Sequence, residues 1–147
     1  MKLLLVCTQG GHVTEMLSLM EAFKAHDIVF LTYDNPLTIN QPYKILTIEY
    51  IGVSLIKMIK SFLPIFKIFK TEKPQMVIST GSEIAIPTFI IARIMGIKTI
   101  YIESWCRVKT RSHTGKVLYY FSDLFLVQWP DLVKVYGKKA RYEGAVI

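Results

Sequence analysis

Short apolar runs alternate with segments of helical periodicity along most of the chain, and this alternation constrains the fold more than any other feature. The runs are continuously apolar, which is the pattern of strands covered by helices on both faces of a sheet. Successive strand–helix–strand units with right-handed crossovers give a doubly wound, mostly parallel sheet of the α/β class. We therefore expect one Rossmann-like domain over residues 1–147.

The loops that follow the strands are the candidate site, because ligands of such sheets bind beyond the carboxyl ends of the strands. These loops read TQGGH, TYDNP, STGSE, ESWCR and QWP. The expected strands cover residues 2–8, 27–33, 43–50, 75–80, 98–104 and 123–128. The expected helices cover residues 11–25, 53–70, 82–95, a segment around 115–122, and a last helix from Pro130.

The loop TQGGH joins the first expected strand to the first expected helix. Gly10 and Gly11 allow a tight turn and let a ligand approach the amides that open the helix, an arrangement suited to a phosphate or diphosphate. His12 is placed to donate to that anion or to act as a general base on a sugar hydroxyl. One alternative is a plain turn with a hydrogen-bonded histidine. Another is a dinucleotide site with Asp34 on a ribose, although the glycine spacing of G-x-G-x-x-G is not met.

The charge balance points to anionic partners. Lys and Arg number 18 against 11 Asp and Glu, which gives a net charge of +7. A nucleic-acid partner is not expected, because the chain carries no recognised motif for one. The first apolar run, residues 3–6, is too short for a signal peptide, and no stretch of about 18 residues lacks charge as a membrane span would.

Residues 51–70 predict a basic amphipathic helix of the kind that lies on membranes. Its lysines lie on one side of a helical wheel, and its phenylalanines and isoleucines spread over the other. The alternative is an ordinary crossover helix packed on the sheet. Pro64 is expected to kink or break the helix. The residues expected to contact a membrane are Lys57, Lys60, Phe62, Phe66 and Phe69.

The second half of the chain carries a resemblance to a known family. The run YIESWCRVKTRSHTGKVLYYFSDLFLVQWPDL (101–132), with GGH near the start and STG at 79–81, resembles the acceptor-side, membrane-associated subunit of a two-part N-acetylglucosaminyltransferase. That enzyme makes lipid-linked N-glycan precursors, and its bacterial counterparts act in capsule and exopolysaccharide assembly. The chain departs from eukaryotic members where Thr8-Gln9 replaces a third glycine and where STGSE replaces a glycine-proline-glycine loop.

The resemblance implies half of a split GT-B glycosyltransferase. By this likeness the chain corresponds to the N-terminal, acceptor-binding half and is inactive alone, while a donor-binding subunit completes a heterodimer and shares the nucleotide sugar. The acceptor is implied to be a polyprenyl-diphosphate-linked sugar, met at the cytoplasmic face of the membrane by a peripheral protein. No metal or other cofactor is implied, and the sequence shows no DxD motif or His/Cys cluster. The alternative function is a non-catalytic scaffold that activates a separate glycosyltransferase.

The resemblance also assigns candidate roles. Glu103 orients an acceptor hydroxyl or serves as base, unless it simply pairs with Arg107, whose guanidinium suits a lipid diphosphate. Ser82 binds ligand or only caps the following helix. The expected catalytic residues are His12 and Glu103. The expected acceptor- or diphosphate-binding residues are Gly10, Gly11, His12, Gly81, Ser82, Ser104 and Arg107.

Overall fold

A computed structural model describes residues 1–33 and 42–146, and it contains a seven-stranded, all-parallel sheet. The strand order is β3-β2-β1-β4-β5-β6-β7. Strands β1 to β3 follow one another toward one edge of the sheet, and strands β4 to β7 follow one another toward the other edge. The strands are β1 Lys2–Val6, β2 Asp27–Tyr33, β3 Lys44–Ile48, β4 Met76–Ser79, β5 Lys98–Ile102, β6 Leu124–Leu126 and β7 Ala140–Arg141. The predicted doubly wound fold is therefore confirmed.

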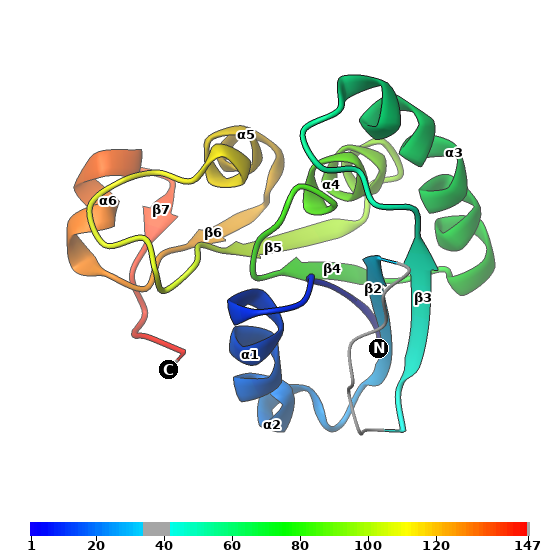
Figure 1. The fold of residues 1–147 in the computed structure, drawn as a ribbon. Coiled ribbons are helices and arrows are strands. Elements are labelled where there is room, and N and C mark those ends of the chain that lie inside the picture. Colours follow the sequence, from blue (N-terminus) through cyan, green and yellow to red (C-terminus); the bar gives the residue numbers. More distant parts are fainter. Residues whose placement is uncertain (34–41, 147) are drawn as a thin grey trace.

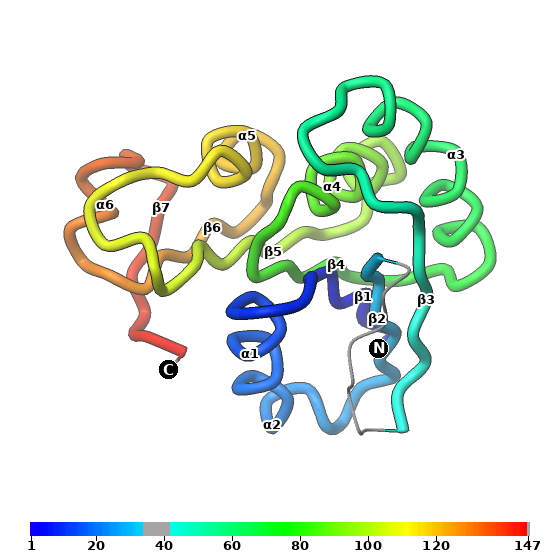
Figure 2. The backbone as a smooth tube through the Cα atoms, viewed as in Figure 1, coloured from blue at the N-terminus to red at the C-terminus, as the bar shows by residue number. Residues whose placement is uncertain are grey.

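Helices cover both faces of the sheet, as Figures 1 and 2 show, with α1 and α2 on one side and α3, α4 and α5 on the other. The helices are α1 Gly11–Ser18, α2 Met20–Phe23, α3 Leu55–Glu72, α4 Ala85–Ile94, α5 His113–Phe121 and α6 Pro130–Tyr136. Each face buries its own apolar cluster: Phe69, Phe89 and Leu118 lie in one, and Met16 and Phe30 lie in the other. This double coverage explains why the strand sequences are apolar throughout.

Several local predictions need correction. The helix expected over 11–25 is divided at Leu19 into α1 and α2. Of the two outcomes expected at Pro64, a kink or a break, the break is wrong, because α3 runs as one helix from Leu55 to Glu72. The two-residue strand β7 was not expected, because so short a strand has no periodicity to detect.

Helix α3 divides its apolar residues between the core and solvent. Ile65 and Phe69 are fully buried against the sheet, so Phe69 cannot contact a membrane and that expectation is wrong. Phe62 is half-buried, whereas Lys57, Lys60 and Phe66 are exposed. Further exposed apolar side chains on or beside this helix are those of Val53, Leu55, Ile56, Ile59 and Leu63. Within the described residues, no helix is long and apolar enough to cross a bilayer.

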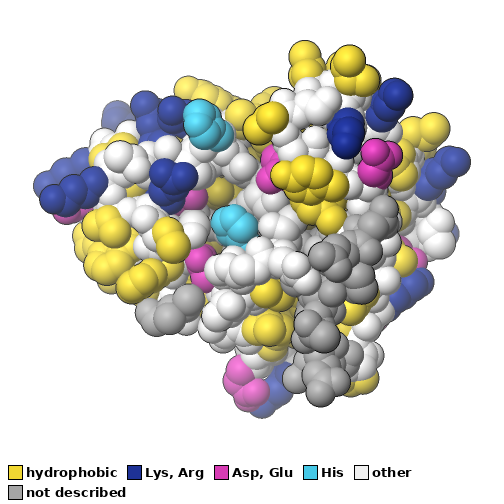
Figure 3. Space-filling model, in the orientation of Figure 1, with side chains coloured by type: hydrophobic (Ala, Val, Ile, Leu, Met, Phe, Trp, Pro, Cys, Tyr) yellow, Lys and Arg dark blue, Asp and Glu magenta, His cyan; other side chains and the backbone are white. Residues whose placement is uncertain are grey.

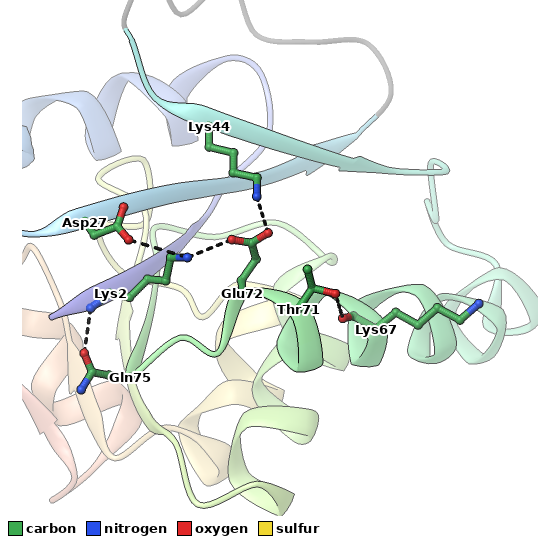
Figure 4. A network of polar contacts seen from close by, with 7 residues as sticks. All are labelled: Lys2, Asp27, Lys44, Lys67, Thr71, Glu72 and Gln75. Atoms are coloured by element: carbon green, nitrogen blue, oxygen red, sulfur yellow. Dashed lines mark hydrogen bonds and ion pairs between the residues drawn. The ribbon is translucent and has the colours of Figure 1, made fainter.

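The last turn of α3 is tied to the sheet by a buried carboxylate, shown in Figure 4. The Glu72 side chain is 4% exposed and accepts from Lys44 Nζ at 2.5 Å and from Lys2 Nζ at 3.0 Å. Lys2 also lies 3.6 Å from Asp27. The hydrogen bonds from Lys44 and Lys2 lower the pKa of Glu72, so the network joins β1, β3 and α3 most strongly when Glu72 is ionised.

We predict that Glu72→Gln lowers the free energy of unfolding by about 1–3 kcal/mol at neutral pH, since it leaves two lysines without their shared acceptor. Because the folded-state pKa of Glu72 is depressed, its contribution is present above the ordinary value of 4.5 and is lost as pH falls below that value. Chemical denaturation at pH 7 and pH 3 measures both effects. Glu21→Gln, which alters an exposed pair with Lys24, is the control and should leave stability unchanged. An equal loss for Glu72→Gln at both pH values would contradict this account.

Candidate functional site

A cavity of about 380 Å³ lies beyond the carboxyl ends of β1, β4 and β5. It brings together Gly11, His12, Ser82, Glu103, Ser104 and Arg107, all of which the sequence placed in the site. Gly10 and Gly81 adjoin these residues in the chain but do not line the cavity. Figure 3 shows Lys and Arg side chains gathered over the α5–α6 side of the molecule, with exposed hydrophobic side chains among lysines over α3.

His12 is held by the loop after β4. Its Nδ1 lies 3.0 Å from the Thr80 carbonyl oxygen, and Thr80 Oγ1 donates back to the His12 carbonyl at 2.7 Å. A carbonyl oxygen can only accept, so Nδ1 carries the ring proton and Nε2 is left as a hydrogen-bond acceptor. The imidazole therefore borders the cavity in the tautomer that a general base requires.

Gly81 provides the space for this imidazole. A Cβ added at Gly81 would lie 2.5 Å from His12 Cε1, and the residue has a φ of +129°. The Ser79 hydroxyl fixes the turn, since it accepts from the Gly81 amide at 3.1 Å. All three residues of the STG motif, Ser79, Thr80 and Gly81, thus help to position His12. Ser82 follows with a φ of +81°, which is strained for a residue other than glycine.

Ser82 is not the cap of the helix that follows, because Ile84 occupies the N-cap position of α4. The Ser82 hydroxyl instead donates to Glu83 at 2.8 Å. Helix capping therefore does not account for this residue.

Glu103 is fully buried and is surrounded by donors. Its carboxylate accepts from the Tyr101 hydroxyl at 3.2 Å, the Ser104 amide at 2.9 Å, the Ser112 amide and hydroxyl at 3.3 and 2.8 Å, and the Tyr136 hydroxyl. The ion pair with Arg107 considered above is absent from the described residues, in which Glu103 forms no salt bridge. Burial and the neighbouring Glu103 raise the pKa of Tyr101 and Tyr136, which keeps both phenols protonated as donors.

Gly115 lets helix α5 approach Glu103. A Cβ at this position would overlap Tyr136 Oη and Glu103 Oε2. Ser112 caps the same helix by accepting from the Gly115 amide at 2.8 Å. Gly115, which belongs to the part of the sequence that resembles the family, therefore has a packing role.

Glu15 is a second buried carboxylate at this site, and the sequence analysis missed it. It is 1% exposed and accepts from Ser104 Oγ at 2.9 Å, the Trp105 amide at 3.2 Å and Gln128 Nε2 at 2.7 Å. Burial raises its pKa. Glu15 lies one helical turn after His12 on α1, so it fixes the helix that carries His12 against the loop that carries Arg107.

The cationic side of the cavity is open to solvent. Arg107 and His113 line it and are exposed, and Cys106 beside them is an exposed free thiol. The other cysteine, Cys7, is buried, and burial raises its pKa to about 12. Asp34, considered above for a ribose contact, lies outside the described residues.

The fold is one that solved structures of a glycosyltransferase and of UDP-GlcNAc 2-epimerases share. MurG of Acinetobacter baumannii matches with a TM-score of 0.74 and 18% identity, over 88% of this chain and 41% of that one. The UDP-GlcNAc 2-epimerase of Neisseria meningitidis matches with a TM-score of 0.75 and 12% identity, over 99% of this chain and 47% of that one. At these identities the likeness establishes the fold alone.

The family follows from the sequence comparison. The chain belongs to the family described as oligosaccharide biosynthesis protein Alg14 like, whose model matches residues 47–146. The human UDP-N-acetylglucosamine transferase subunit ALG14 is 38% identical over 88 residues, covering 56% of this chain and 40% of the human protein. The subunit of the same name from Yarrowia lipolytica is 27% identical over 99% of this chain and 81% of its own length. The chain thus spans less than half the length of its mammalian relatives.

We predict that Gly81→Ala displaces the His12 ring, because the new methyl group occupies the space of the imidazole. The His12 imidazole resonances in NMR spectra should shift, and the unfolding free energy should fall by about 1–3 kcal/mol from backbone strain. Gly96→Ala is the matched control: Gly96 also has a positive φ, of +70°, but nothing lies within 4 Å of its added Cβ. His12 resonances that move equally in both variants would refute the packing role of Gly81.

Proposed function

We propose that this chain is the acceptor-binding subunit of a UDP-N-acetylglucosamine-dependent glycosyltransferase that builds lipid-linked glycan precursors. The observation that carries this proposal is the His12 tautomer, with Nδ1 donating to Thr80 and Nε2 left to accept a proton at the cavity wall. Relatives from human, Schizosaccharomyces pombe and Yarrowia lipolytica are named as UDP-N-acetylglucosamine transferase subunits, which supports the donor class.

In the proposed step, His12 Nε2 accepts the proton of an acceptor sugar hydroxyl. The hydroxyl oxygen forms a bond to the anomeric carbon of the donor sugar. The bond from that carbon to the diphosphate breaks, and the leaving UDP keeps the electron pair. Arg107, exposed at the cavity, stabilises diphosphate charge, and the amides at Gly10 and Gly11 assist at the start of α1.

Glu103 acts in this proposal as a positioning residue rather than as the base. Its carboxylate is fully buried and already accepts five hydrogen bonds, so it has little capacity to take a proton from a substrate. Its contacts bring β5, α5 and α6 together, and Ser104 carries the connection on to Glu15.

A second subunit supplies the donor-binding half. This chain matches 41% and 47% of two chains of the same fold class, and its relatives are named as subunits. We therefore propose a heterodimer that is active only when both subunits are present. A scaffold without chemistry of its own remains the competing function, and the following substitution separates the two.

We expect His12→Gln to lower the rate of sugar transfer by about 100- to 10,000-fold in the reconstituted heterodimer, through loss of the general base. The assay uses labelled UDP-N-acetylglucosamine and a polyprenyl-diphosphate-linked sugar, and co-purification checks that the partner still binds. The control is His26→Gln, which removes a histidine in the turn between α2 and β2 and should keep full activity. Full activity of His12→Gln with an intact complex would favour the scaffold.

The proposed enzyme meets its lipid-linked acceptor at a membrane through the exposed side of α3. Ile56 and Ile59 are 68% and 62% exposed. In the sequence, Lys57 follows Ile56 and Lys60 follows Ile59. Exposed apolar side chains flanked by lysines suit the interface of an anionic bilayer. This peripheral placement, with the site on the cytoplasmic side, is part of the proposal.

We predict that the double substitution Ile56→Glu and Ile59→Glu weakens binding to vesicles containing anionic lipid by at least about tenfold, since two apolar contacts are replaced by charges that the surface repels. Vesicle co-sedimentation measures this. Leu17→Glu is the control, because Leu17 is exposed on α1 at the opposite face of the sheet. Equal binding of all three proteins would remove α3 from the membrane contact.

A further inference from the structure

Two further cavities continue from the one that contains His12, and together they form a trough toward α3. A cavity of about 790 Å³ shares Ser82 and Glu83 with the His12 cavity. A smaller one of about 170 Å³ shares Glu49 and Tyr50 with the larger cavity and reaches Lys57 and Lys60. The shared walls make the three cavities neighbours, in the order Lys60, Tyr50, Ser82, His12.

The middle cavity has the chemistry of a site for a neutral, hydroxyl-rich ligand. Its described lining includes the carboxylates of Glu49 and Glu83 and the hydroxyls of Thr8 and Thr32, and it contains no Lys or Arg. Carboxylates accept hydrogen bonds from sugar hydroxyls but repel phosphate. A volume of this order suits a small organic ligand.

Tyr33 gives an independent indication that this cavity is built for a ligand. Tyr33 lines the cavity and is 9% exposed. Its ring packs edge-on against the ring of Tyr50, with the two ring centroids 5.0 Å apart. Its buried hydroxyl forms no hydrogen bond of good geometry within the described residues, although the Glu83 carboxylate and the Ile51 backbone lie near enough to affect its pKa. A buried group so poorly paired gains a hydrogen bond when a ligand supplies a well-placed partner.

The cationic side chains of the trough stand at its two ends. At the α3 end stand Lys57, held 3.7 Å from Glu49, and Lys60, for which the described residues provide no ion pair. At the His12 end stand Arg107 and His113. A split transferase handles two diphosphates, that of the acceptor and that of the donor, and the middle cavity suits neither.

We propose that the acceptor lies along this trough, with its diphosphate at Lys57 and Lys60, its neutral sugar in the middle cavity beside Tyr33 and Glu83, and its reacting hydroxyl at the wall next to His12. Arg107 and His113, which lie beside His12, then bind the diphosphate of the donor. This inference rests on the proposed function, and it moves the acceptor diphosphate away from Gly10, Gly11 and Arg107, where the sequence analysis expected it. The lipid leaves the trough at the exposed apolar side of α3.

The first test measures binding of a short-chain polyprenyl diphosphate carrying one neutral hexose to the chain alone. Lys60→Gln should raise its Kd by about 5- to 10-fold through loss of a charge-assisted phosphate contact, whereas the matched variant Arg107→Gln should change it by less than about twofold. Saturating probe should also leave the alkylation rate of Cys106 unchanged, because this exposed thiol borders the His12 cavity and neither the middle cavity nor the one at α3.

The opposite result would overturn the inference but not the proposed function. In that case Arg107→Gln raises the Kd of the probe, Lys60→Gln does not, and the probe slows the alkylation of Cys106. If the unsubstituted chain fails to bind the probe, both the inference and the proposed acceptor role fail.

Tyr33→Phe tests the sugar position separately. The variant should raise the Kd of the hexose-bearing probe by about 3- to 10-fold, through loss of one hydrogen bond, and should leave the Kd of the same polyprenyl diphosphate without sugar unchanged. Its unfolding free energy should not fall, since the lost hydroxyl forms no hydrogen bond of good geometry within the described residues. Equal effects on both probes, or no effect on either, would overturn the sugar assignment.

Discussion

The burial of two carboxylates at the carboxyl edge of the sheet is the constraint on which the rest of the site depends. A buried carboxylate is costly unless donors surround it. Glu103 meets that requirement with donors from β5, α5 and α6, and Glu15 meets it with donors from the loops after β5 and β6. Gln128 joins the two, because its amide donates both to Glu15 and to the Glu103 carbonyl. Loops far apart in sequence are thereby fixed around one cavity.

The sequence predicted the sheet well because its strands are apolar on both faces and its helices begin at recognisable turns. It also predicted which loops converge, since parallel strands present their carboxyl ends at one edge. It could not predict the partners of Glu103, because Ser112 and Tyr136 approach only through tertiary packing. Glu15 was missed for a related reason: a glutamate on a short amphipathic helix is indistinguishable in sequence from a solvated one. The available signal was a glutamine soon after an apolar strand, as Gln128 is after β6.

The membrane-facing prediction was partly wrong for a geometric reason. The apolar arc of α3 is wide enough to pack on the core and also to extend into solvent. A helical wheel does not show where the buried part of the arc ends and the exposed part begins. Phe69 belongs to the part that packs on the sheet, while Ile56 and Ile59 belong to the part that remains exposed. Pro64 lies on the exposed side, where loss of one helical hydrogen bond is offset by packing of the opposite side on the sheet.

In the proposed enzyme, the exposed side of α3, the trough and the fixed imidazole of His12 follow one another along the carboxyl edge of the sheet. The claim at its centre is that Thr80 selects the His12 tautomer with the proton on Nδ1. Nitrogen-15 NMR of labelled imidazoles above pH 8 measures this directly. The account predicts a protonated Nδ1 and an unprotonated Nε2 for His12. A protonated Nε2 would contradict it, since that ring could accept no proton from an acceptor hydroxyl at the cavity.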